Sequence, residues 1–251
     1  SYAFGGSGTQ DAQTPTGIVP GLLSQVEQFT GELRGFAADP ETLYVVWSGA
    51  NNYLFPAFNT IFYPLVGGPL FGPILPPDEP ADAVADIRTA INNLTALGAR
   101  KFLVVNLPDL GDAPLTVPDL APLVDQSVRD TLRSQSLLHN RKLARTVRRL
   151  NRQGVSIGRD IELLDAFTLF KLKLYGPGRK DAGPASGCLL PPGFPNPPCD
   201  PTMPPDFDQD LRTRIWDEQH PTTELHKILA RRAFRVIDSF SASDDDDDDD
   251  D

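Results

Sequence analysis

Three short strand-like segments, far apart along the chain, constrain the fold more than any other feature. They occupy residues 43–47, 102–105 and 161–165. The first two are unbroken apolar runs, which are typical of strands that are buried on both faces of a parallel sheet, and the third, Ile-Glu-Leu-Leu-Asp, is predicted as one more strand. Apolar residues also recur at helical spacing over about 22–33, 81–97, 120–151 and 221–240. The alternation predicts an α/β fold, a three-layer sandwich with helices on both faces of a parallel sheet.

Segments rich in Gly and Pro separate these elements and predict irregular structure. We expect a loop over residues 1–19, an exposed irregular insertion over residues 55–80 and a loop over residues 175–215. The 251-residue chain has no internal repeat and no sharp break that marks a second domain. It predicts one domain over residues 1–240 and a disordered acidic tail over residues 241–251, because a block of like charges repels itself and stays solvated.

The acidic tail accounts for most of the net charge of −11. Residues 244–251 are eight consecutive aspartates, and without them the net charge is −3. A mildly acidic folded part argues against nucleic acid as a partner. We interpret the tail as a solubilising end, with loose binding of hard cations as the alternative. No apolar run reaches about 18 residues, so no transmembrane segment is expected, and residues 1–30 show no signal peptide.

Cys188 and Cys199 are the two cysteines, and both lie in the loop rich in Gly and Pro. With three scattered histidines they make a poor zinc site, because zinc needs four convergent ligands. A disulfide that closes the loop between the two cysteines is the favoured interpretation and fits an oxidising compartment. Two free thiols are the alternative. No metal site is predicted.

An Asp-x-x-His pair, Asp217 and His220, precedes the last predicted helix. In ester hydrolysis a histidine takes the proton of the nucleophile, and an acid orients that histidine. The short loop before a helix can fold both side chains towards one point, so the pair is a candidate acid and base. Taken alone, the pair is better explained by helix capping. The Pro-Thr sequence after His220, together with Asn51 at a strand end, favours catalysis.

Asn51 follows the first apolar run in a Gly-Ala-Asn-Asn sequence. Functional groups of parallel sheets lie beyond the carboxyl ends of the strands, where the Asn51 amide can donate to an oxyanion. By itself this sequence is equally good turn chemistry. The earlier Gly5-Gly6-Ser7-Gly8 matches neither a nucleophile elbow nor a phosphate loop. A flexible turn that offers a backbone N–H is the simpler interpretation of that segment.

Four passages together resemble the GDSL-type lipases and acylhydrolases, also called SGNH hydrolases, near the thermolabile haemolysins and phospholipid acyltransferases. The passages are residues 1–6, 43–53, 102–111 and 215–222. The resemblance implies the SGNH hydrolase fold with a flavodoxin-like parallel sheet. It also implies that Gly5 and Asn51 are oxyanion donors, and that Asp217 and His220 are the acid and base of a Ser-His-Asp triad that needs no cofactor.

The chain departs from this family in two places. The family's Gly-x-Asn-Asp is Gly49-Ala50-Asn51-Asn52 here, so Asn52 lacks the charge of the family's aspartate. The family's nucleophilic serine lies in a Gly-Asp-Ser motif on the first strand, and no Gly-Asp-Ser occurs in the 251 residues. We therefore expect an N-terminally incomplete domain whose central first strand is missing, with apolar neighbours such as Val45 and Val104 exposed.

Two main functions are compatible with these observations, with an acidic secreted scaffold whose tail binds calcium as a third option. The first is hydrolysis or transfer of ester bonds, with a small-molecule or lipid ester as substrate, peripheral contact with lipid through the apolar insertion, and a secreted or periplasmic location. The chain as given would then be inactive, because His220 has no serine to activate; Ser7 is the first serine to test as an overlooked nucleophile. The second is a non-catalytic binding or surface protein that retains the fold.

Overall fold

Three parallel strands form the central sheet, in the order β3-β4-β5. The computed structural model of the chain describes residues 1–14, 17–66, 79–112, 126–174 and 223–242. The strands are β3 (Leu43–Val46), β4 (Lys101–Val105) and β5 (Asp160–Leu164). Val46 pairs with Val104 and Val104 with Leu163, so the carboxyl ends of the strands lie at one edge of the sheet. All three predicted strands are confirmed to within one residue.

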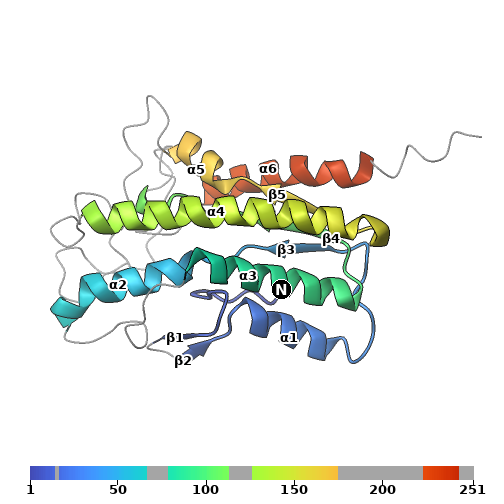
Figure 1. Cartoon of the computed structure of the whole chain (residues 1–251), viewed down its shortest axis with the longest axis horizontal. Helices are drawn as coiled ribbons and strands as arrows, with labels where there is room; N and C mark the ends of the chain where they lie inside the picture. Colours follow the sequence, from blue (N-terminus) through green and yellow to red (C-terminus); the bar gives the residue numbers. More distant parts are fainter. Residues whose placement is uncertain (15–16, 67–78, 113–125, 175–222, 243–251) are drawn as a thin grey trace, which may run out of the picture.

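Three helices cover one face of the sheet (Figure 1). They are α1 (Leu22–Glu32), α3 (Pro80–Leu97) and α4 (Gln126–Gly154). Their buried apolar residues form one core with alternate residues of the strands: Val46, Phe102, Val104 and Ile161. The three helices were predicted from the sequence. The described part of α4 begins at Gln126, and residues 120–125, where the helix was expected to start, lie outside the described part of the chain.

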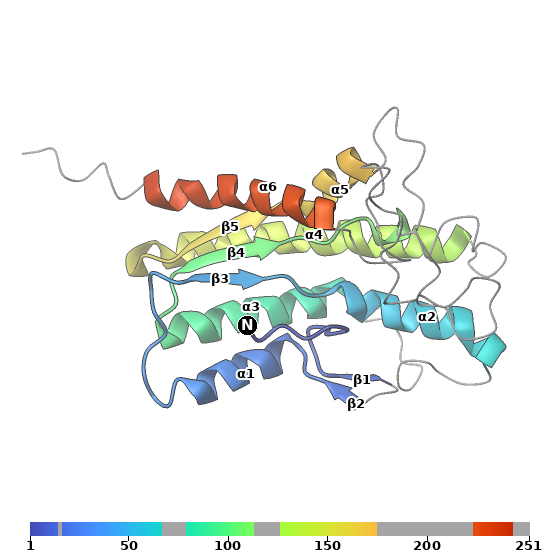
Figure 2. The same cartoon turned by 180° about the vertical axis from the view of Figure 1, so that it is seen from behind.

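Two helices cover the opposite face (Figure 2). They are α5 (Ala166–Leu174), which the sequence did not predict, and α6 (Thr223–Ala242). They pack on the strand residues that point the other way, Leu103, Val105 and Leu164. Because successive strand residues face opposite sides of a sheet, one unbroken apolar run serves both cores. The predicted three-layer α/β sandwich is therefore confirmed.

Two predictions of irregular structure were wrong. Residues 50–66 form a helix, α2 (Ala50–Val66), although an irregular insertion was expected from residue 55. The helix forms despite Pro56 and Pro64 because it buries Tyr53 and Phe58 in a core shared with Leu107. Burial of such side chains outweighs the loss of the two helical hydrogen bonds. Within the expected loop of residues 1–19, a short hairpin pairs β1 (Ala12–Thr14) with β2 (Gly17–Val19).

The edge of the sheet at β3 is partly open. Val45 is 60% exposed, as predicted, because α6 packs on β4 and β5 and leaves that side of β3 uncovered. The predicted exposure of Val104 was wrong: this side chain is 0% exposed because β4 is the middle strand and α1, α3 and α4 supply the core around it. Within the described residues β3 pairs with β4 alone.

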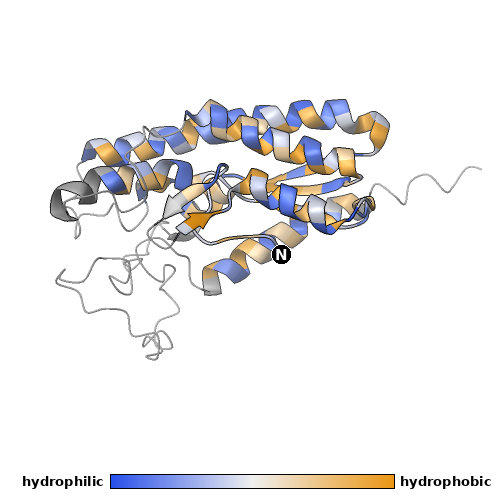
Figure 3. Cartoon of the chain, turned by 90° about the horizontal axis from the view of Figure 1, so that it is seen from below, coloured by the Kyte–Doolittle hydropathy of each residue, from blue (hydrophilic) through white to orange (hydrophobic). Residues whose placement is uncertain are grey.

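The helices show the expected division into polar and apolar sides (Figure 3). Hydrophilic and hydrophobic residues alternate along the ribbons, and the buried apolar residues of the helices pack against the sheet or a neighbouring helix, as amphipathic periodicity requires. Among the described helices, none combines the length and the apolar character that crossing a bilayer requires. Cys188 and Cys199 lie outside the described residues, so the disulfide stays a prediction.

Candidate active site

The candidate site is built where β3 ends and α2 begins. Trp47, Ser48 and Gly49 join the two elements, and Asn51 is the second residue of α2. Asn51 Nδ2 donates a hydrogen bond of 2.9 Å to the carbonyl oxygen of Ser7, two residues after Gly5. The structure therefore brings the end of the strand and the N-terminal glycine segment together. A primary amide nitrogen carries two hydrogens, so Asn51 retains a second donor for an acceptor in the site.

Three further hydrogen bonds hold the glycine segment on α2 and on the turn that precedes it. Ser48 Oγ donates to the carbonyl oxygen of Gly8 at 3.0 Å. Asn52 Oδ1 accepts from the backbone N–H of Thr9 at 3.0 Å, and Asn52 Nδ2 donates to Thr9 Oγ1 at 2.8 Å. Both Asn52 and Thr9 are buried. The segment that carries Gly5 is thus fixed at several points on the turn that carries Asn51.

The same contacts explain why an amide suits position 52. Thr9 Oγ1 donates its hydrogen to Asp86 Oδ2 at 2.8 Å, so it can only accept from its other neighbour. Asn52 supplies that donor through Nδ2. An aspartate at position 52 would accept from the Thr9 N–H equally well but would offer no donor to the hydroxyl, and would add a second carboxylate beside Asp86.

The Gly5–Ser7 turn is open to solvent at Gly5 and bonded at Ser7. Gly5 is exposed, with no heavy atom within 4 Å of the place a Cβ would occupy, and Gly6 has a φ of 78°. Ser7 Oγ donates to the carbonyl oxygen of Gly8 at 3.1 Å and accepts from Gln25 Nε2 at 2.8 Å. No hydrogen bond joins Ser7 to a histidine within the described residues. Among the described residues, the Ser7 hydroxyl thus has no histidine to act as the base that a nucleophilic serine needs.

His139, which the sequence analysis did not single out, lies directly beneath the strand-to-helix turn. Its imidazole is 0% exposed, and a Cβ at Gly49 would lie 2.9 Å from His139 Cε1. His139 Nδ1 is 3.0 Å from the hydroxyl of Tyr53, a residue of α2. Burial lowers the pKa of His139 to about 4, so the ring is neutral at pH 7. The pair Tyr53 and His139 supports the turn and does not supply a base to the site.

A cavity of about 960 Å³ opens beside Asn51. Every residue of β3, the following turn and Asn51 line it, together with aromatic side chains of the N-terminal segment and α1: Tyr2, Phe4 and Phe29. Its volume is at the upper end of the range for small-molecule sites. Apolar walls with an amide donor at the strand end suit a ligand with an apolar chain and one polar, oxygen-bearing group.

Polar residues at the end of β4 are occupied with structural contacts. Asn106 Nδ2 donates to Asp165 Oδ1 at 2.9 Å, and Asn106 Oδ1 accepts from the N–H of Phe167 at 3.0 Å. Burial raises the pKa of Asp165, but hydrogen bonds from Thr168 and Asn106 offset this and leave the pKa below its ordinary value. These contacts cap the start of α5, so the carboxylate of Asp165 is engaged and is not a free acid for the site.

Asp109, further along the same loop, is bound by a cation. Asp109 Oδ2 forms an ion pair of 2.8 Å with Arg133 Nε, and Asp109 Oδ1 accepts from the N–H of Gly111. Arg133 also pairs with Asp112. Burial and the neighbouring charge of Asp109 raise the pKa of Asp112, although Arg133 acts against them. Asp109 is thus held as an anchor of the loop to α4.

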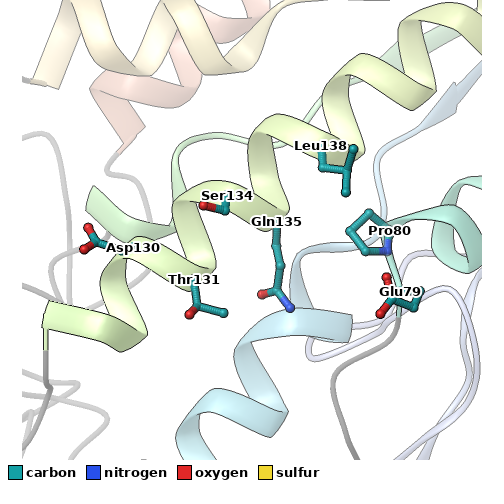
Figure 4. A pocket seen from close by; sticks show the side chains of 7 residues that line it. All are labelled: Glu79, Pro80, Asp130, Thr131, Ser134, Gln135 and Leu138. Carbon is teal, nitrogen blue, oxygen red and sulfur yellow. The ribbon is translucent and has the colours of Figure 1, made fainter.

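A second cavity, of about 400 Å³, lies between the start of α3 and the first turns of α4 (Figure 4). Glu79 and Asp130 lie at its two ends, and Ser134 and Thr131 do not converge with either of them (Figure 4). No nucleophile–base pair is formed there. Across the described ranges, no group of three or more His, Cys, Asp and Glu side chains has the arrangement of a metal site.

Asp217 and His220 lie outside the described residues. Their assignment as acid and base therefore stays a prediction. The α6 helix that follows them begins at Thr223, and its His226 lines the same large cavity as Asn51. The start of α6 thus lies on the cavity that Asn51 borders.

Comparisons with known proteins identify the family of the chain and agree with its fold. The family model for GDSL-like lipase/acylhydrolase matches residues 1–233, and the chain belongs to that family. Among curated proteins, a phosphatidylcholine-sterol acyltransferase of Aeromonas hydrophila is 29% identical over 139 residues, which cover 55% of this chain and 33% of that protein. A GDSL esterase/lipase of Arabidopsis thaliana is 27% identical over 228 residues, covering 88% of this chain and 58% of the relative. The chain thus spans about a third to just over half of these two relatives.

Proposed function

We propose that the protein hydrolyses or transfers ester-bound acyl groups by a Ser-His-Asp mechanism, with a nucleophilic serine that the 251 residues do not contain. The observation that carries the proposal is Asn51, a side-chain amide at the carboxyl end of β3, bonded to the glycine segment beside a cavity of about 960 Å³. Membership of the GDSL-like lipase/acylhydrolase family supports ester chemistry. Lipid or small-molecule esters are the proposed substrates.

The roles follow from the chemistry of acyl transfer. The serine Oγ attacks the acyl carbonyl carbon while His220 takes its proton, and Asp217 orients the resulting imidazolium. The carbonyl oxygen becomes an oxyanion that accepts from the Gly5 N–H and the second hydrogen of Asn51 Nδ2. The alcohol then leaves with the proton from His220, and water or an acceptor alcohol releases the acyl group. The apolar cavity walls hold the acyl chain.

The first test concerns the source of the nucleophile. The gene sequence that precedes the codon of Ser1 is read for an in-frame Gly-Asp-Ser, and a protein extended by that segment is assayed on a short p-nitrophenyl ester. We expect turnover that His220→Ala lowers by several orders of magnitude. A protein that contains Gly-Asp-Ser, folds and still shows no turnover would favour the non-catalytic binding function.

The second test isolates the role of Asn51 in that extended protein. Asn51→Ala should lower kcat by roughly 10²–10³, the usual cost of one oxyanion donor. Ser48→Ala is the matched control, because it removes another hydrogen bond to the same glycine segment without touching the proposed oxyanion. An equal loss in both variants would mean that Asn51 acts only by holding the segment.

The third test uses the 251-residue chain alone. It should not turn over the ester, because Ser7 Oγ has no histidine among its hydrogen-bond partners in the described residues. Turnover that a serine-directed phosphonate abolishes, and that Ser7→Ala also abolishes, would make Ser7 the nucleophile.

A further inference from the structure

Five exposed arginines lie on one side of the C-terminal half of α4. They are Arg141, Arg145, Arg148, Arg149 and Arg152. The intervals of three and four residues between them place their side chains on the same face of the helix, while Leu143, Val147 and Leu150 point into the core. We call these five residues the arginine face.

The arginine face has no counter-charge nearby in sequence or in the described structure. Residues 131–159 contain eight Lys and Arg residues and neither Asp nor Glu. None of the five arginines takes part in an ion pair within the described residues, whereas Arg133, nearer the start of the helix, pairs with Asp109 and Asp112. Like charges three and four residues apart repel one another and destabilise a helix. An anion that binds along the face would remove this repulsion.

The chain carries a matching run of negative charge just beyond α6, the other helix that ends at this end of the molecule. Eight aspartates, residues 244–251, begin two residues after the last residue of α6, Ala242. The helices α4 and α6 end at the same end of the molecule (Figures 1 and 2). The nine residues that follow α6, 243–251, span about 30 Å when extended. This length is more than twice the diameter of a helix, which is about 10–12 Å. The aspartates are therefore long enough to pass from one face of the sandwich to the other.

We propose that the arginine face of α4 binds the aspartate tail, residues 244–251, of the same chain. The guanidinium group presents paired N–H donors that match a carboxylate, so arginine suits this contact better than lysine. Seven of the eight cationic residues in 131–159 are arginines. In the bound state the tail screens the arginine face from other anions, and salt weakens the contact because both partners are at the surface.

The arginines of α6 are a poorer site for the tail. Arg231, Arg232 and Arg235 line a groove together with the carboxylate of Asp165, so this groove is not purely cationic. These three residues therefore serve as the matched control.

The test places one reporter lysine on each helix. Arg145→Lys and Arg232→Lys both keep the charge, and both positions are exposed. A carbodiimide joins a carboxylate to an amine with loss of water and no spacer, and mass spectrometry of the digested full chain locates the bond. We expect several-fold more cross-linking of the tail to Lys at 145 than to Lys at 232. The excess should vanish at about 1 M salt, where the Debye length is about 3 Å.

Three results would overturn the proposal. Equal yields at the two reporters, or a higher yield at position 232, would mean that the arginine face does not bind the tail. Isotope-labelled and unlabelled copies of the chain are also mixed before cross-linking. Links that form only between a labelled and an unlabelled copy would assign the tail to a second molecule. The third result concerns two double variants. We expect Arg141→Gln with Arg148→Gln to reduce the yield at position 145 several-fold, and Arg231→Gln with Arg235→Gln to leave that yield unchanged. The opposite outcome in either variant would overturn the proposal.

Discussion

The imidazole of His139 occupies the space beside Gly49 that any larger residue would need. A Cβ at position 49 would lie 2.9 Å from His139 Cε1, a separation that real Cβ atoms do not show. Gly49 also has a φ of 115°, a conformation that residues with a Cβ rarely adopt. The turn that presents Asn51 therefore depends on a glycine and on a buried histidine 90 positions later in the chain.

Gly49→Ala should destabilise the protein because of the positive φ at this position and because of the contact with His139. The methyl group strains the backbone and collides with a ring that is 0% exposed and cannot move into solvent. We expect a loss of about 2–4 kcal/mol in the free energy of unfolding, measured by urea denaturation. Gly5→Ala is the control: no atom lies within 4 Å of its Cβ position, so the change should stay within about 0.5 kcal/mol.

Buried His139 should also make stability depend on pH in a defined window. Its pKa is lowered from 6.5 to about 4 by burial, so the folded protein holds the neutral ring. The unfolded chain binds a proton near pH 6.5. The stabilisation is therefore fully present above pH 6.5 and is lost as the pH falls from 6.5 to 4, by about 3 kcal/mol in total.

Urea denaturation across this window measures that effect. The slope of unfolding free energy against pH should be shallower for His139→Gln than for the natural chain, because the variant has no ring to protonate. His226→Gln provides the control, since His226 is exposed and is not part of the buried pair of Tyr53 and His139. Identical slopes for all three proteins would show that His139 is not buried as the structure has it.

The sequence predicted the sheet better than it predicted the support of the site. Strand runs such as residues 102–105 are recognisable because both faces of β4 are buried. The helix α2 was missed because Pro56 disfavours a helix locally, and only contacts with Leu107, 51 positions away, outweigh it. The packing of His139 on Gly49 is equally non-local. No periodicity or spacing marks a histidine whose partners are a turn and a tyrosine on another helix.

Asn52→Asp should destabilise the protein by about 1–3 kcal/mol. The aspartate would leave Thr9 Oγ1 without its donor and would bury a carboxylate close to Asp86, which accepts from the same hydroxyl. Thermal or urea denaturation measures the change. Adding Asp86→Asn to this variant should restore part of the loss, since it removes the second charge. A double variant less stable than Asn52→Asp alone would contradict this account of the site.

The open edge of β3 should make the chain associate when it is produced alone. Within the described residues β3 pairs only with β4, and Val45 is 60% exposed on this strand. Unpaired N–H and C=O groups beside apolar side chains invite pairing with another chain, and a charged residue on an edge strand opposes it.

Size-exclusion chromatography should show species larger than a monomer, and Val45→Lys should shift them towards the monomer. Ile18→Lys is the matched control, because Ile18 is 74% exposed on β2 and lies away from this edge. A monodisperse monomer from the natural chain, or an equal shift in both variants, would show that the edge of β3 does not drive association.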